Sequence, residues 1–169
     1  RAPDNSGFLT AIASDSVGYG LVYVKPNGEI TCASRIGHSK LAGPMTSRFD
    51  AETRKWVVYV GTRSSTTKTS DGGLDVIRFD SPNASGGYIN VDTVEYYSGY
   101  STTPLDMVYD PKSEYLWIVT SSALEYWEDN SENRQDSLRT PFSMNGLTGA
   151  EFTSIDVDAR GNLWVGTSA

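Results

Sequence analysis

The sequence predicts an all-β protein in which one antiparallel unit is repeated, as in the blades of a β-propeller. Three observations support this prediction. The 169 residues include 10 Tyr and 4 Trp, together with 16 Gly and 7 Pro. Aromatic residues suit a pleated surface, whereas glycine and proline supply the turns between strands. No window of helical length has the apolar spacing of an amphipathic helix, and one short motif recurs along the chain.

The recurring motif is a short alternating strand that ends in aspartate, a polar turn, and a second strand that carries tryptophan. It occurs at residues 46–62, 105–120 and 153–167, and a copy without tryptophan lies at residues 9–24. The aspartates are expected to accept backbone N–H groups of the turn. The tryptophans are expected to be largely buried at equivalent positions in successive sheets. The structural anchors of the repeat are Asp50, Trp56, Asp110, Trp117, Asp158, Gly161 and Trp164.

The spacing of the aspartates sets the size of each unit. Counted from Asp15, the intervals are 35, 60 and 48 residues, which bracket the 40–50 residue period of propeller blades. We therefore expect a single propeller-like region, 1–169, with three- to four-stranded meanders stacked face to face. The chain is expected to be an incomplete part of a larger propeller. Strand 163–167 is therefore expected to have an open outer side. The approximate repeat units are 8–42, 43–97, 98–145 and 146–169.

The last copy of the motif resembles a known repeat. Residues 157–167 read V-D-A-R-G-N-L-W-V-G-T, which is similar to the D-x-x-G-N-L-W-(I/V)-G-T core of the two-component-regulator propeller family. The copy at Asp110 departs from that core, with Glu114-Tyr115 in place of Gly-Asn, and the copy at Asp50 lacks the turn glycine. Residues 154–156 and 161–164 also resemble the halves of a sialidase-type Asp-box, with a different spacing. The resemblance implies propeller blades, but propellers host many unrelated activities.

Composition excludes several classes of function. The net charge of −7 disfavours a nucleic-acid binder and an anionic membrane surface, since both need a basic patch. Cys32 and His38 are the only residues of their types, so we expect neither a disulfide nor a Cys or His metal centre. Cys32 lies in an alternating run and is expected to be a small core residue. We expect no cofactor and no bound metal.

Two polar loops are the candidate interaction sites. The insertion at residues 63–73 and the acidic segment at residues 128–136 are expected to be exposed and to contact partners. Calcium binding is the alternative for the acidic segment, because carboxylate and amide oxygens are calcium ligands. A sugar-stacking role is the alternative for the tyrosine-rich stretches. The candidate residues in the two loops are Arg63, Lys68, Asp71, Asp129, Glu132 and Asp136.

These observations favour a non-catalytic scaffold and interaction module of a large extracellular, periplasmic or virion-surface protein. The expected partners are another protein, or further copies or the remainder of the same polypeptide, with carbohydrate as a second class. A Ser-His-Asp set is not recognisable, because His38 has no identifiable partner. Two alternatives remain: part of a carbohydrate-active propeller enzyme, and the sensor domain of a signalling receptor.

Overall fold

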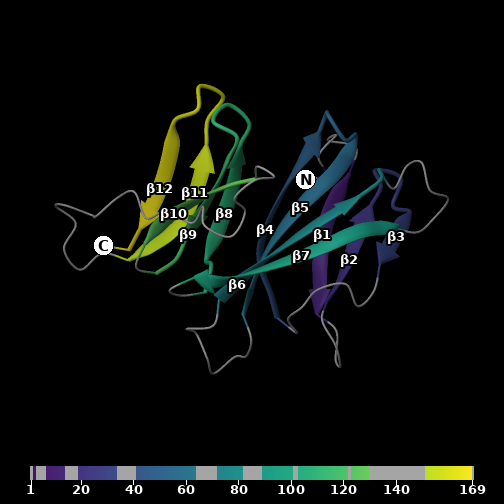
Figure 1. The fold of residues 1–169 in the computed structure, drawn as a ribbon, viewed down its shortest axis with the longest axis horizontal. Coiled ribbons are helices and arrows are strands. Elements are labelled where there is room, and N and C mark those ends of the chain that lie inside the picture. The colour runs from purple at the N-terminus through teal and green to yellow at the C-terminus, as the bar shows by residue number, and fades with distance from the viewer. Residues whose placement is uncertain are drawn as a thin grey trace.

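The computed structural model describes residues 2, 7–13, 19–33, 41–63, 72–81, 89–100, 103–121, 123–129 and 151–168. These residues form antiparallel strands in four sheets, numbered here in chain order (Figure 1). The predicted all-β class is thereby confirmed. Within the same ranges, no helix is long and apolar enough to span a membrane.

Each sheet is a meander in which every strand pairs with its neighbours in the sequence. Sheet 1 contains β1 (Phe8–Ala13), β2 (Tyr19–Val24) and β3 (Ile30–Ala33). Sheet 2 contains β4 (Leu41–Asp50), β5 (Lys55–Arg63), β6 (Gly72–Phe79) and β7 (Val91–Tyr100). Sheet 3 contains β8 (Asp106–Asp110), β9 (Tyr115–Val119) and β10 (Leu124–Glu128). Sheet 4 contains β11 (Phe152–Val157) and β12 (Leu163–Thr167).

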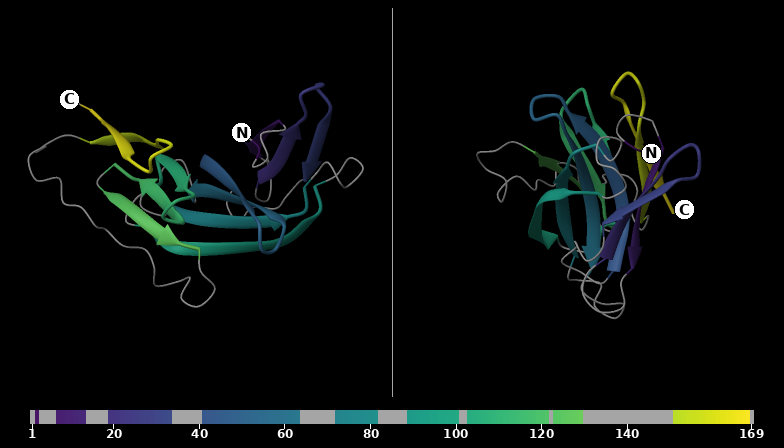
Figure 2. Two further views of the ribbon diagram at one scale, coloured as in Figure 1. Left: turned by 90° about the horizontal axis from the view of Figure 1, so that it is seen from above. Right: turned by 90° about the vertical axis from the view of Figure 1, so that its right-hand side faces the viewer.

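The four sheets stack like propeller blades. Their first strands are neighbours: β1 lies beside β4, β4 beside β8, and β8 beside β11. The described sheets follow an open arc whose two ends lie on the same side of the molecule (Figure 2). Sheet 2 extends slightly beyond its expected unit, because β4 begins at Leu41 and β7 ends at Tyr100. The division into four repeat units otherwise stays a prediction.

Three apolar layers hold the sheets together, one between each successive pair. Alternation along a strand sends neighbouring side chains to opposite faces. We call the face of a sheet that is turned toward the preceding sheet its leading face, and the opposite one its trailing face. In β5, Trp56 and Val58 belong to the layer with sheet 1, whereas Val57 and Tyr59 belong to the layer with sheet 3. Sheet 2 therefore has two buried faces.

The three repeat tryptophans are not equivalent, which corrects the expectation from the sequence. Asp50 pairs with Lys55, so Trp56 is the next residue and points from the leading face of sheet 2. Asp110 pairs with Tyr115, so Trp117 is two residues on and points from the trailing face of sheet 3. A shift of one residue moves a side chain to the other face of a sheet. Because the two turns have the same length, the sixth residue after Asp50 and the seventh residue after Asp110 lie on opposite faces of their sheets.

Trp164 was expected to be buried, and that expectation is wrong. The amide of Asp158 binds the carbonyl of Asn162, so Trp164 is also two residues beyond the turn pair and belongs to the trailing face. Leu163 and Val165 pack against sheet 3, which leaves the Trp164 side of β12 outward and the residue 65% exposed. The open outer side expected for strand 163–167 is present in the described arc.

Cys32 was expected in the core, but it is exposed. It pairs with Val22 of β2, while the neighbouring Thr31 is fully buried with the layer between sheets 1 and 2. The alternating run was read correctly as a strand, and Cys32 lies on its outer rather than its inner face.

The turn aspartates behave as the motif predicts. Asp50 accepts the amide of Glu52 at 3.1 Å, Asp110 accepts that of Lys112 at 3.0 Å, and Asp158 accepts that of Arg160 at 2.8 Å. Each carboxylate thus closes its turn through backbone N–H groups. In the Asp158 turn, Gly161 has a φ of 83°. In the Asp110 turn, Glu114 takes a φ of 62° at the position where the family motif has glycine.

Candidate functional site

A polar cleft of about 1000 Å³ lies between sheets 2 and 3. One wall comes from β4, β6 and β7, and the other from the ends of β8, β9 and β10. The β4–β5 turn, residues 51–54, and the β8–β9 turn, residues 111–114, form its rim. The capped turns of two repeats therefore position the rim.

Asp129, directly after β10, is the central charge of this cleft. Its Oδ2 accepts hydrogen bonds from Nη2 of Arg48 at 2.8 Å and from the hydroxyl of Tyr59 at 2.7 Å. Its Oδ1 accepts a hydrogen bond from Nη2 of Arg78 at 2.6 Å. The Asp129 side chain is only 3% exposed. A residue of sheet 3 thus joins three strand residues of sheet 2.

Further contacts order the two arginines. Nε of Arg48 donates to the Tyr59 hydroxyl at 2.8 Å, and its guanidinium lies 5.2 Å from the centre of the Tyr109 ring. Nη1 of Arg78 lies 3.2 Å from Oε1 of Glu95. A guanidinium presents planar, fixed donors, so two such groups define the position of a carboxylate closely.

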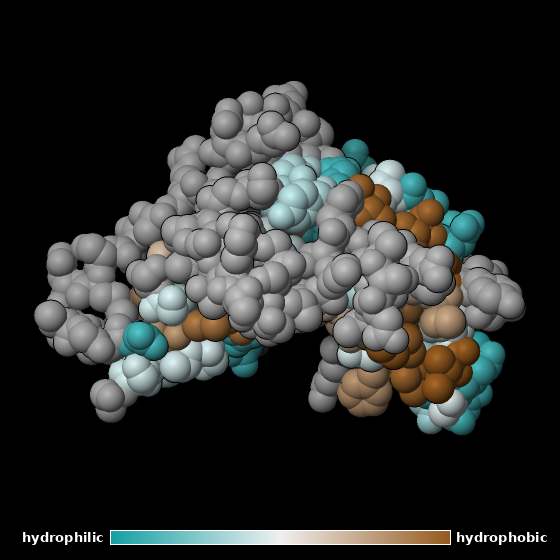
Figure 3. All heavy atoms as spheres, turned by 90° about the horizontal axis from the view of Figure 1, so that it is seen from below, coloured by the Kyte–Doolittle hydropathy of each residue, from teal (hydrophilic) through white to brown (hydrophobic). Residues whose placement is uncertain are grey.

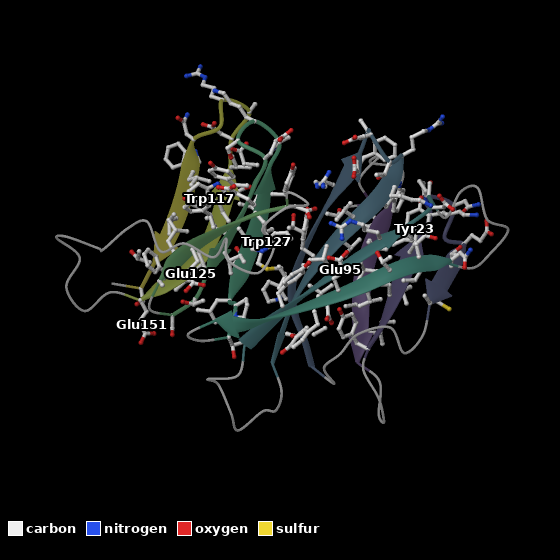
Figure 4. The ribbon with its side chains drawn as sticks, viewed as in Figure 1. Tyr23, Glu95, Trp117, Glu125, Trp127 and Glu151 are labelled. Atoms are coloured by element: carbon white, nitrogen blue, oxygen red, sulfur yellow. The ribbon has the colours of Figure 1, made fainter. Side chains whose placement is uncertain are left out.

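Aromatic side chains underlie the charged network. Trp127 of β10 packs against Tyr97, with ring centres 5.2 Å apart, and against Tyr59 at 6.0 Å. Glu95 and Trp127 come from the two sheets that face each other here (Figure 4). The hydroxyl of Tyr97 donates a short hydrogen bond to Glu95. The network therefore rests on a packed interface rather than on mobile side chains.

The electrostatics of the cleft follow from this packing. Burial raises the pKa of the Asp129 carboxyl, but the Arg48 hydrogen bond, the Arg78 charge and the Tyr59 hydrogen bond together hold it below its usual range. Burial, followed by the charge of Asp129, raises the pKa of the Tyr59 hydroxyl. Asp129 is thus an anion and Tyr59 a neutral donor at neutral pH.

Asp129 was expected in a solvent-exposed interaction loop, and the structure corrects this. Its carboxylate is buried against two arginines because β10 ends at the sheet interface. The same pairing argues against calcium binding by Asp129. No group of three or more His, Cys, Asp or Glu in the part of the chain that the structure describes could hold a metal ion.

The other candidate loop residues lie elsewhere. Arg63 is the last residue of β5, and its side chain lies outside the described residues. Lys68, Asp71, Glu132 and Asp136 also lie outside the described residues. The anchors Asp50 and Asp110 begin the two rim turns of the cleft, whereas Asp158 and Gly161 belong to the turn of sheet 4.

The candidate residues predicted from the sequence do not include Arg48, Tyr59 or Arg78. A weak signal was available, because Arg78 interrupts an otherwise apolar run, Val76-Ile77-Arg78-Phe79. A charge at such a position needs a partner once the sheet is packed. The identity of that partner could not be read from the sequence.

The rim of the cleft is acidic. Its lining contains six carboxylates and two guanidinium groups, and the two arginines are paired with Asp129 and Glu95. Glu52 and Glu114 are exposed on the rim turns. The surface that a ligand meets first is therefore negative.

Comparison with protein families gives one match. Residues 146–169 match the family described as two component regulator propeller, which confirms the resemblance at residues 157–167. The matched range contains β11, the Asp158 turn and β12. No curated protein matches the chain.

Proposed function

We propose, from the propeller repeat at residues 146–169 and the cleft between sheets 2 and 3, that this chain is a non-catalytic interaction module. It serves as a propeller scaffold in a larger extracellular, periplasmic or virion-surface protein, and the cleft is its binding surface. The partner presents a basic segment to the acidic rim.

The observation that carries this proposal is the pairing of Asp129 with Arg48 and Arg78. Both oxygens of the carboxylate accept hydrogen bonds, so this charged group stabilises the two walls. Removal of the Asp129 carboxylate would leave the charges of Arg48 and Arg78 without a counter-charge. The cleft is therefore a preorganised shape with an acidic rim, which suits docking.

Charge complementarity supports a basic partner. Six carboxylates line the cleft against two guanidinium groups, and those two are held by neighbouring acids. Rim charges mainly set the rate of association and its dependence on salt. A lysine- and arginine-rich peptide segment is the chemistry that this surface favours.

The test uses the full chain and a fluorescent lysine- and arginine-rich peptide, with a glutamate-rich peptide as the comparison. We expect the basic peptide to bind, with an association rate that falls as salt rises. The double change Glu52→Lys and Glu114→Lys should lower that rate, because it reverses two exposed rim charges. Glu151→Lys is the control for one reversed charge and is compared with each rim change alone, since Glu151 is exposed beside sheet 4.

Equal binding of both peptides, or equal rates for the rim and control variants, would contradict the proposal.

A carbohydrate ligand is the second candidate, because Tyr109 and the 46% exposed Phe49 also line the cleft. Aromatic faces bind sugar C–H groups while carboxylates bind hydroxyls. Glycan turnover that is abolished by Glu95→Gln or Glu128→Gln would favour the enzyme alternative.

A further inference from the structure

The strand β7 forms the outer edge of sheet 2. It has 10 residues and no proline, and within the described ranges β6 is the only strand that pairs with it (Figure 1). At the opposite edge of this sheet, β4 lies instead beside β1 and β8 of the neighbouring sheets. An edge strand can pair with a further strand through its backbone, and proline would interrupt that pairing. The long outer edge of β7 can therefore accept an extended peptide.

The same strand also forms one margin of the acidic cleft. Thr93 and Glu95 of β7 line the cleft. Along this strand, Val94 packs in the layer with sheet 1, whereas Tyr97 packs in the layer with sheet 3, as alternation along a strand requires. A strand added beside β7 would alternate in the same way. Every second side chain of that strand would then lie at the cleft.

The charges beside β7 favour a basic strand. The sequence of β7 contains Asp92 and Glu95 and no basic residue, so pairing of two β7 strands from two copies would bring like charges together. Glu128, at the end of β10, adds a carboxylate on the opposite wall of the cleft. Hydrophobic surface gathers instead on the side of the molecule that carries sheet 1 (Figure 3). An extended segment with lysine or arginine at alternate positions therefore suits this edge.

We propose that a basic segment of a partner protein adds to sheet 2 as a strand beside β7 and directs every second side chain into the acidic cleft. This inference rests on the proposed function, because it assigns a binding mode to the same cleft. The backbone of the segment supplies affinity, and its alternate lysine or arginine side chains supply selectivity. Binding by charge alone requires neither the backbone amides nor the alternate spacing, so the two proposals can be separated.

The test measures binding of the full chain to a fluorescent peptide in which lysine alternates with threonine. Two further peptides have the same sequence and carry N-methyl groups, one on the lysine amides and the other on the threonine amides. Amides of alternate residues point to opposite sides of a strand, so only one methylated set faces β7. An N-methyl group removes the amide donor but leaves every charge in place. We expect that set to bind about tenfold more weakly, and the other set to bind as the unmodified peptide does.

The peptide results also separate this inference from the basic-peptide proposal. Equal binding of all three peptides would overturn strand addition and leave the basic-peptide proposal in place. Equal weakening of both methylated peptides would overturn strand addition as well, because the effect would not depend on the side of the strand. If the unmodified peptide does not bind while the lysine- and arginine-rich peptide does, strand addition alone fails. If neither peptide binds, both proposals fail.

A substitution in β7 tests the location of the added strand. Thr93→Lys places a positive charge where the lysine side chains of the peptide are expected, so it should weaken binding of the unmodified peptide. Thr153→Lys is the matched control, because Thr153 is also a strand threonine and lies on β11 of sheet 4. Both threonines are exposed, so neither change should prevent folding. Equal affinity of the two variants for the peptide would overturn the assignment to β7.

Discussion

The hydroxyl of Tyr19 donates a hydrogen bond of 2.8 Å to Oδ2 of Asp75 across the interface between sheets 1 and 2. Both residues are fully buried. Burial raises the pKa of Tyr19, and the charge and hydrogen bond of Asp75 raise it further, so the phenol remains a donor. A buried polar contact thus joins sheets 1 and 2, as the contacts of Asp129 join sheets 2 and 3.

Removing that donor should destabilise the fold. Tyr19→Phe keeps the ring but takes a hydrogen bond from a buried carboxylate, which costs about 1–3 kcal/mol of the free energy of unfolding. Urea denaturation with an intrinsic fluorescence readout measures the change. Tyr115→Phe is the control, because Tyr115 also packs against aromatic rings, but its hydroxyl makes no hydrogen bond within the described part of the chain. An equal loss in both variants would show that the effect belongs to phenols in general.

Asp129→Asn should destabilise the interface between sheets 2 and 3 by about 3 kcal/mol at neutral pH, because two partly buried arginines lose their counter-charge. Asp80→Asn is the control. Asp80 also contacts a cation, Lys55, but its side chain is 53% exposed and exposed pairs contribute little. Urea denaturation of both variants gives the comparison.

The Asp129 effect should depend on pH. The pKa of this carboxyl is lower in the folded chain than in the unfolded chain. Its stabilisation is therefore complete above the unfolded pKa, about 3.9, and is lost as pH falls through the folded value. The difference in free energy of unfolding between the unaltered chain and Asp129→Asn should stay constant at neutral pH and become smaller below about pH 4. A gap of constant size down to pH 2 would contradict the assignment.

Glu114→Gly should stabilise the chain. Glu114 has a φ of 62°, a conformation that costs a residue with a Cβ atom more than it costs glycine. The conformational entropy that glycine loses on folding offsets part of this advantage. A net increase of about 0.5–1 kcal/mol in the free energy of unfolding remains. Glu52→Gly, in the equivalent turn at a residue without positive φ, should instead reduce stability. Thermal unfolding that ranks the two variants the other way would refute this account.

Asn162→Ala should raise the pKa of Asp158. That pKa is lowered to about 2, chiefly by the hydrogen bond from the Asn162 side chain, whose Nδ2 lies 2.8 Å from Oδ2. The remaining amide hydrogen bonds keep part of the shift. Carbon-13 NMR of the carboxyl groups follows the titration, and Asn27→Ala on sheet 1 is a control that should leave the Asp158 midpoint unchanged.

The local structure of the repeats could be predicted from the sequence. Asp110 and Asp158 were predicted to cap turns from residues within four positions of them, and the structure shows those hydrogen bonds. Such contacts depend on nearby residue types alone. The meander order followed for the same reason, since each strand pairs with the next along the chain.

Contacts between sheets were not predictable in the same way. Trp56 and Trp117 face opposite sides because they lie six and seven residues after aspartates whose turns have the same length. Trp164 also lies six residues after its aspartate, but its turn is one residue shorter, and the repeat pattern does not show that difference. Asp129 contacts Arg48 across 81 positions and Arg78 across 51. A single sequence does not reveal which buried charges meet at that separation, so the charged network appeared only in the structure.

The position of Asp129 in the chain also has a consequence for the order of folding. Arg48 and Arg78 are synthesised with sheet 2, but their shared carboxylate follows the last strand of sheet 3. Until that residue has left the ribosome, the two arginines lack their shared counter-charge, although most of the apolar cover from sheet 3 has already been synthesised. The ion pairs at this interface therefore cannot form before all three strands of sheet 3 have been synthesised. A partial sheet 3 can cover apolar residues of sheet 2, but it cannot neutralise the two arginines.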